Sequence, residues 1–268
     1  MTLPTGKEHI SFSEMTDWVL CPFRHKLLHI ERVRPGYIGP ALTVGTAIHH
    51  GCEQYLSTGT HDLEGSLKMI SDDFDMNKEK LEYSRYSQKN MEANLEAAAE
   101  ILLEVPEFFD STFPGWKFVA AEQDLYERLD KFPDTSFKGF IDAVITAPGR
   151  RKNTVTTWIL DFKTCTFGWT REHKQDVMAR NQLILYKTYW CKKKDIDPKD
   201  VRAAFVLLKK TGKSGQRCEL VDVSAGDVTR ERAVKLVESM VSSLKRGISI
   251  KNRTSCSRCD MRETVHCP

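Results

Sequence analysis

The sequence predicts an α/β fold in which a small mixed central sheet is flanked by helices. Two observations lead to this prediction. First, short runs of β-branched and aromatic residues, typical of buried strands, alternate with longer helical stretches. Second, the elements follow the order helix, three strands, helix, strand, which favours a mixed sheet with helices packed on it. With 268 residues, the chain can bury a substantial core as a single domain, residues 1–268.

The N-terminal part, residues 11–60, is predicted to contain two helices. A serine, either Ser11 or Ser13, can cap the first helix, which is expected to end near Pro22. The second helix is expected at about 43–56, where apolar residues recur at helical spacing.

The rest of the chain divides into a helical insertion, a core and a tail. Residues 62–110 are rich in Glu, Lys, Leu, Ala and Met, which predicts a helical insertion or cap. Residues 117–223 form the predicted core, with a helix at about 178–191 and strands at about 117–129, 136–146, 155–163, 201–209 and 217–223. Residues 226–268 are expected to form a long helix, at about 228–245, followed by a cysteine-rich tail.

The composition is typical of a soluble, globular protein. Apolar residues make up 40% of the chain and charged residues 29%, and no apolar run is long enough to span a membrane. The polar start is not a signal peptide, so we expect a reducing, cytoplasmic setting and no membrane partner. The net charge of +3 is too small to identify a nucleic-acid binder. Local basic runs are more suggestive, although solvated loops explain such runs equally well.

Two of the predicted strands place two carboxylates and a lysine near each other. Residues 139–142 read Gly-Phe-Ile-Asp, and residues 161–163 read Asp-Phe-Lys. Alternate side chains of a strand share a face, so Asp161 and Lys163 point the same way. Together with Asp142 they supply two hard oxygen donors for Mg²⁺ or Mn²⁺ and an ammonium that can stabilise charge on a phosphate. The alternative is an ordinary strand end that carries a surface salt bridge.

Three further side chains suit a nuclease site. His49 lies on the second predicted helix, where its imidazole can serve as a metal ligand, although a surface or capping histidine is the alternative. Gln182 and Tyr186 are one helical turn apart after Lys163, so they share a helix face. Their amide and phenol can orient the lysine or contact a phosphate backbone. A partly buried amphipathic helix would explain them as well.

Taken together, four motifs resemble the RecB-type branch of the PD-(D/E)XK nucleases. They occur in the order of that branch and near its spacing: Gly-Thr-Ala-Ile-His at 45–49, Gly-Phe-Ile-Asp at 139–142, Asp-Phe-Lys at 161–163, and Gln182-x-x-x-Tyr186. An opening segment, residues 11–27, is similar to the N-terminal motif of the branch, so the resemblance covers residues 11–267. It implies a restriction-endonuclease-like αβββαβ core with a helical insertion.

The resemblance also implies a role for each site residue. The implied ligands of Mg²⁺ or Mn²⁺ are His49, Asp142, Asp161 and the backbone carbonyl of Phe162. Lys163 would position or deprotonate the attacking water and stabilise the developing charge. Gln182 and Tyr186 would support Lys163 and the DNA backbone. Asp161 stands where the family more often has glutamate, which its D/E pattern allows.

The chain contains eight cysteines, three of which lie in the tail. Cys256 and Cys259 form a short chelating turn, Cys267 follows, and Cys21 is a candidate fourth ligand. This arrangement resembles the iron–sulfur subset of RecB-type nucleases, which includes helicase-associated and CRISPR-adaptation nucleases. It implies a [4Fe–4S] cluster that ties the N-terminal segment to the tail. A zinc site, with His266 in place of Cys21, and free thiols are the alternatives.

The leading functional hypothesis is a metal-dependent DNA exonuclease that prefers single-stranded DNA. The strand preference, 5′→3′ polarity, a helicase or recombination partner, and a role in DNA recombination, repair or processing come from the resemblance alone. Trp169 and Tyr86 are candidates for stacking on bases. Two other classes of protein compete with this hypothesis. One is a catalytically silent DNA-binding adaptor that retains the nuclease fold, and the other is a protein whose cysteine centre performs redox chemistry.

Overall fold

The computed structural model describes residues 2–33, 40–77, 88–149 and 151–268. Its centre is a mixed six-stranded sheet with the order β1-β3-β4-β5-β6, and β2 pairs with β3 off this path. The strands are β1 (His9–Ser11), β2 (Lys117–Arg128), β3 (Ser136–Pro148), β4 (Val155–Cys165), β5 (Val201–Lys209) and β6 (Cys218–Asp222). β1 runs parallel to β3, and β4 runs parallel to β5, whereas the other pairs are antiparallel.

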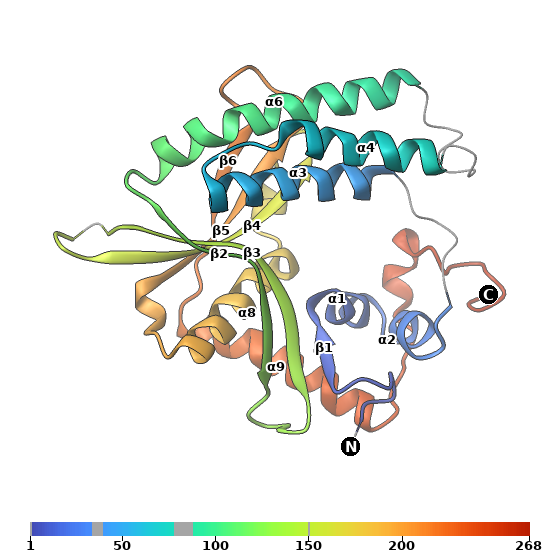
Figure 1. The fold of residues 1–268 in the computed structure, drawn as a ribbon. Coiled ribbons are helices and arrows are strands. Elements are labelled where there is room, and N and C mark those ends of the chain that lie inside the picture. The colour runs from blue at the N-terminus through green and yellow to red at the C-terminus, as the bar shows by residue number, and fades with distance from the viewer. Residues whose placement is uncertain (1, 34–39, 78–87, 150) are drawn as a thin grey trace.

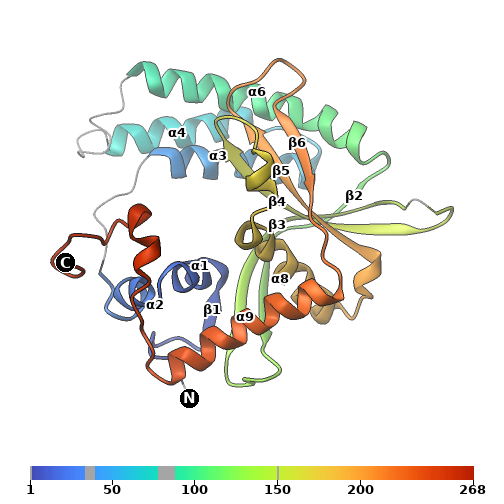
Figure 2. The same ribbon diagram turned by 180° about the vertical axis from the view of Figure 1, so that it is seen from behind.

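Helices surround the sheet on both faces (Figures 1 and 2). The longer ones are α1 (Phe12–Leu20), α3 (Pro40–Thr58), α4 (Leu63–Asn77), α6 (Gln88–Thr112), α8 (Val177–Lys194) and α9 (Asp227–Lys245). Short turns of helix are α2 (Pro22–His25), η1 (Lys26–Ile30), α7 (Arg171–Lys174), η2 (Pro198–Asp200) and η3 (Arg253–Arg258). Ser11 caps α1 by accepting a hydrogen bond from the N–H of Glu14 at 3.2 Å.

Two hydrophobic cores lie on opposite faces of the sheet. One joins α8 and α9 to the sheet and contains Phe137, Ile141 and Phe205. The other joins α3 and α6 to the sheet and contains Leu160 and Phe162. Alternating strand residues enter different cores, which is why β4 and β5 read as almost continuous apolar runs buried on both faces.

β3 changes its neighbour along its length. Its start pairs with β1, through Ser136 to Lys138, and its end pairs with β4, from Ala143 onward. Among the described strands, only β2 lies beside residues 139–142. Asp142 is therefore the last residue before β4 joins, and we call this place the β3–β4 fork.

The tail lies against the N-terminal helices, which Figures 1 and 2 show at one end of the molecule. The N–H of Phe23 donates to the carbonyl of Ile250 at 3.2 Å. The side-chain amide of Asn252 donates to the carbonyl of Leu20 at 2.9 Å. The N-terminal segment and the tail are therefore in direct contact, and the cluster that was predicted to join them stays a prediction.

The predicted fold class is confirmed, and the predicted strands and helices agree with the observed bounds to within about three residues. β1 was not predicted. It has only three residues, and it exists because it pairs with β3 at Phe137, far along the chain. No helix among the described residues combines the length and the apolarity that crossing a bilayer requires.

Candidate active site

The β3–β4 fork brings the two predicted aspartates to adjacent strands. Asp142 Oδ2 accepts the backbone N–H of Phe162 at 2.7 Å. Asp161, the residue before Phe162, is only 2% exposed. The hydrogen bond fixes Asp142 to β4 at the point where the ladder between β3 and β4 begins.

Two side chains hold the carboxylate of Asp161. Gln182 on α8 donates from Nε2 to Oδ1 at 2.9 Å. Oδ2 forms an ion pair with Nζ of Lys163 at 2.6 Å. Asp161 and Lys163 thus meet on one side of β4, as the alternation of a strand dictates. Lys163 is partly exposed, so its ammonium can face both the carboxylate and a substrate phosphate.

Tyr186 connects α8 to β3 at the site. Gln182 also donates from Nε2 to the hydroxyl of Tyr186 at 3.2 Å. The Tyr186 ring lies against Gly139, where an added Cβ would come within 2.6 Å of ring atom Cε1. Gly139 is therefore required for this close approach. The chain of contacts from Gly139 through Tyr186 and Gln182 ends at the carboxylate of Asp161.

His49 reaches the fork from α3. Its Nδ1 lies 3.6 Å from Oδ2 of Asp142, and its ring meets the ring of Phe162 edge to face at 5.7 Å. Burial lowers the pKa of His49 to about 4, and the charge of Asp161 only partly opposes this effect. The imidazole is therefore neutral at pH 7 and keeps a lone pair for a metal ion.

Both aspartates have raised pKa values. Burial raises the pKa of Asp142 to about 6, although the N–H of Phe162 opposes the shift. Burial and then the charge of Asp142 raise the pKa of Asp161 to about 6. Two crowded carboxylates beside a neutral imidazole are stabilised by a hard cation, so the donor set fits Mg²⁺ or Mn²⁺.

In the described part of the chain, no three His, Cys, Asp or Glu side chains are arranged closely enough to hold one metal ion. His49 and Asp142 face each other, whereas the carboxylate of Asp161 is engaged by Gln182 and Lys163. The structure thus brings the predicted residues into one neighbourhood, and their assignment as metal ligands stays a prediction. The same holds for the carbonyl of Phe162.

Two acidic residues near the fork were not selected from the sequence. Glu53 follows His49 by one turn of α3, and burial together with the charges of Glu122 and Asp142 raises the pKa of Glu53 to about 8. The register between β2 and β3 places Glu122 opposite Asp142. The helical spacing from His49 was a signal for Glu53. Glu122 had no such signal, because its position depends on how two strands pair.

All four predicted cluster cysteines line one cavity of about 500 Å³ between the N-terminal helices and the tail: Cys21, Cys256, Cys259 and Cys267. None of them forms a disulfide. The N–H of Asn252 donates to Sγ of Cys21 at 3.2 Å, and the guanidinium of Arg24 donates to Sγ of Cys259 at 3.8 Å. His266, the alternative zinc ligand, does not line this cavity. Thiols are the usual ligands of iron–sulfur clusters and of zinc. However, no three cysteine or histidine side chains among the described residues lie close enough together to hold one metal ion, so the cluster stays a prediction.

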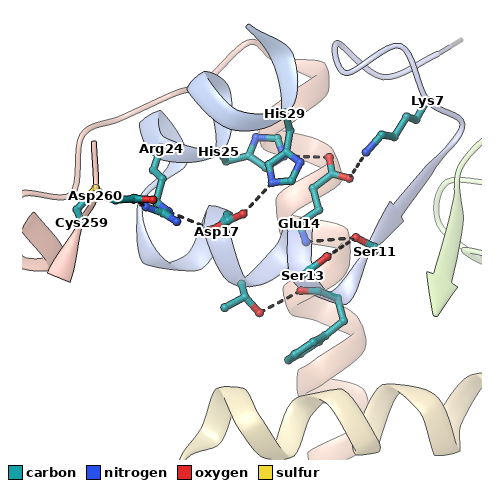
Figure 3. Close-up of polar contacts among 12 residues, drawn as sticks. Lys7, Ser11, Ser13, Glu14, Asp17, Arg24, His25, His29, Cys259 and Asp260 are labelled. Atoms are coloured by element: carbon teal, nitrogen blue, oxygen red, sulfur yellow. Dashed lines mark hydrogen bonds and ion pairs between the residues drawn. The ribbon is translucent and has the colours of Figure 1, made fainter. Parts of the chain in front are cut away.

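A network of charged side chains supports this cavity (Figure 3). Glu14 of α1 and His25 of α2 are both fully buried, and Oε1 lies 3.0 Å from Nε2. Arg24 donates from Nε to Asp17 at 3.1 Å and forms an ion pair with Asp260 of the tail. Leaving the buried Glu14 without its partner would be costly, so this contact fixes α1 relative to α2. The partly exposed ion pair between Arg24 and Asp260 links α2 to the tail.

Comparison with known proteins agrees with this geometry. No curated protein matches the chain. A crystal structure of a protein named "Putative exonuclease" from Eubacterium rectale is similar in fold, with a TM-score of 0.58 and 16% identity over 97% of this chain and 90% of that one. The family pattern of the PD-(D/E)XK nuclease superfamily matches residues 9–264, which include the β3–β4 fork, α3 and α8. The chain therefore belongs to the PD-(D/E)XK nuclease superfamily.

Proposed function

We propose that this chain is a metal-dependent DNA exonuclease of the RecB-type branch, which prefers single-stranded DNA and degrades it in the 5′→3′ direction. The observation that carries the proposal is the meeting of Asp142, Asp161 and Lys163 at the β3–β4 fork of a chain from this superfamily. The branch, the strand preference and the polarity rest on the motif resemblance. The proposed setting is DNA recombination, repair or processing inside the cell, with a helicase or recombination partner.

In this proposal, one or two Mg²⁺ or Mn²⁺ ions are held by His49, Asp142, Asp161 and the carbonyl of Phe162. When bound, such an ion polarises the scissile phosphate and lowers the pKa of a bound water. As an ammonium, Lys163 would orient that water and stabilise the charge on the phosphate. In the alternative role it would be a neutral amine that takes the proton of the water and becomes the ammonium. Gln182 holds the Asp161 carboxylate in place, and Tyr186 holds Gln182.

The purified chain is expected to degrade single-stranded DNA when Mg²⁺ or Mn²⁺ is present and to stop when the metal is chelated. Oligonucleotides labelled at the 5′ or the 3′ end, single-stranded or duplex, report the polarity and the strand preference. Release of the 5′ label as short products before the 3′ label supports 5′→3′ digestion. Binding of DNA without any metal-dependent degradation would identify the chain as a silent adaptor and reject the enzyme.

The proposal includes a [4Fe–4S] cluster held by Cys21, Cys256, Cys259 and Cys267. Its support is the shared cavity of these thiols and the contacts that Arg24 and Asn252 make to two of them. A cluster there would join segments more than 230 residues apart, since Asn252 and Cys21 are separated by 231. Its contribution would thus be to stability and not to hydrolysis.

Anaerobically purified protein is expected to absorb broadly in the blue part of the visible spectrum and to contain iron and sulfide. Cys256→Ser should remove both the absorption and the iron, whereas Cys165→Ser, a matched change outside the cavity, should keep them. Bound zinc with no iron would favour the zinc site, and His266→Ala would then show whether His266 is a ligand. Protein without either metal would leave the cysteines as free thiols.

A further inference from the structure

Phe140 is an exposed aromatic residue beside the candidate site. It lies two residues before Asp142 on β3, so the two side chains share a strand face. Its ring is 52% exposed, although Phe137 and Ile141 on the same strand are fully buried. Nζ of Lys138, a further two residues back, lies 5.1 Å from the centre of the Phe140 ring. A basic, an aromatic and an acidic side chain thus follow one another along this face toward the fork.

The backbone that carries Phe140 is fixed to the site. Tyr186 contacts it twice, because its ring covers Gly139 and its hydroxyl is hydrogen-bonded to the backbone of Phe140. Tyr186 is in turn bonded to Gln182, and Gln182 to Asp161. The position of the exposed ring relative to the carboxylates is therefore set in advance. Such preorganisation is what a substrate-binding side chain needs.

The aromatic residues selected from the sequence suit this role less well. Trp169 stacks on His173 with ring centres 4.3 Å apart and also packs against Phe205 at 5.0 Å. Both of these contacts anchor the loop after β4. Tyr86 lies outside the described residues. Across the β2–β3 ladder, Tyr126 lies opposite Lys138 and is 44% exposed, which extends the aromatic surface away from the fork.

We propose that Phe140 is a stacking platform for a base of the single-stranded DNA substrate, and that Lys138 contacts a phosphate of the same strand. The inference rests on the proposed function and names residues that determine strand preference. A base has a flat π-face that can stack on Phe140 only when it is unpaired from a complementary strand. An ammonium at Lys138 attracts the backbone without reading sequence. A platform next to Asp142 therefore favours an unpaired strand at the point of cleavage.

The test compares two DNA ligands and four variants. Binding of a labelled oligothymidylate, and of a base-free deoxyribose-phosphate oligomer of the same length, is measured by fluorescence anisotropy with Ca²⁺ as the divalent ion. The variants are Phe140→Ala, Phe140→Trp, Lys138→Met and the control Phe118→Ala. Phe118 is also an exposed phenylalanine of the sheet, but it lies opposite Ile145 beyond the fork.

Phe140→Ala is expected to weaken oligothymidylate binding roughly 10-fold, with no effect on the base-free oligomer, and Phe140→Trp to restore it. Lys138→Met should lower the affinity for both ligands by the same factor. It should also reduce the salt dependence of binding by about the amount that one phosphate contact contributes. Phe118→Ala should change neither. Thermal unfolding should be unaffected by Phe140→Ala, since the ring is mostly exposed.

The stacking proposal would be overturned if Phe140→Ala lowered the affinity for both ligands equally, or lowered neither. That result can be separated from failure of the proposed function. If the parent chain degrades DNA with Mn²⁺ while Phe140→Ala binds normally, the enzyme stands and the platform is wrong. If the parent chain has no nuclease activity, the binding data still decide whether Phe140 stacks on bases.

Discussion

Asp161→Asn is expected to reduce metal-dependent DNA degradation by about 1000-fold or more. The substitution keeps the shape of the side chain and an oxygen for the hydrogen bond from Gln182. It removes the negative charge that pairs with Lys163 and that a divalent cation requires. The measurement is the initial rate of release of labelled nucleotides from single-stranded DNA with saturating Mn²⁺, compared with the parent chain.

The same variant should be more stable than the parent chain when metal is chelated at pH 7. The pKa of Asp161 is raised from its ordinary value of 3.8 to about 6, so the folded protein holds the proton more tightly than the unfolded chain does. The ionised carboxylate therefore lowers the free energy of unfolding as the pH rises from about 4 through 6. Asparagine resembles the protonated acid. The variant's free energy of unfolding should therefore exceed that of the parent chain by about 3 kcal/mol at pH 7, and the difference should vanish below pH 4.

Opposite changes in activity and stability distinguish a catalytic carboxylate from a structural one. Asp130→Asn is a suitable control, because the side chain of Asp130 is 86% exposed and its ion pair with Lys192 lies on the surface. It should alter stability by less than about 0.5 kcal/mol and leave the activity intact. Retained activity in Asp161→Asn would remove Asp161 from the site, and a large loss of stability would make it a structural residue.

Gly139→Ala is the second substitution with a large expected effect. The new methyl group would lie within 2.6 Å of the Tyr186 ring, so the ring or the strand must move. Forcing a methyl group into packed surroundings costs about 1–3 kcal/mol of stability. The movement also reaches Gln182 and Asp161 through their hydrogen bonds, so we expect DNA degradation to fall about 100-fold. Thermal unfolding and nuclease rates check the two effects.

Gly45→Ala provides the matched control, because a Cβ at that helical position would meet no atom within 4 Å. It should be neutral or slightly stabilising, since alanine favours helix more than glycine does. A second check combines Gly139→Ala with Tyr186→Ala. Once the ring is absent, the added methyl group should cost little further stability, and a full additional loss would show that Tyr186 is not its obstacle.

Much of the fold could be predicted because its signals are local. β4 and β5 carry dense β-branched and aromatic runs, and α8 and α9 are long enough to be unambiguous. β1 could not be predicted, because three residues are too few to show the alternation of a strand. It forms because it pairs with β3, which lies far along the chain. Local pattern defines the elements that are long, whereas pairing across the chain defines the short ones.

The candidate site divides in the same way. The strand alternation that joins Asp161 to Lys163 and the helical turn that joins Gln182 to Tyr186 can be read from spacing. The exposure of Phe140 could not be predicted from the sequence, since an apolar residue between Gly139 and Asp142 is normally expected in a core. Nothing local shows that β4 pairs with β3 only from Ala143 onward and leaves the preceding edge of β3 without β4 as a neighbour.

The hydrogen bonds of Asn252 have a consequence for how the molecule is assembled. Their partners at Cys21 and Leu20 are made 231 and 232 residues earlier in translation. The contact between the N-terminal helices and the tail can therefore form only after the strands that lie between them in the sequence have been synthesised. Closures over such distances are slow, so we expect the strands β1 to β6 to pair first and the tail to dock onto α1 and α2 last.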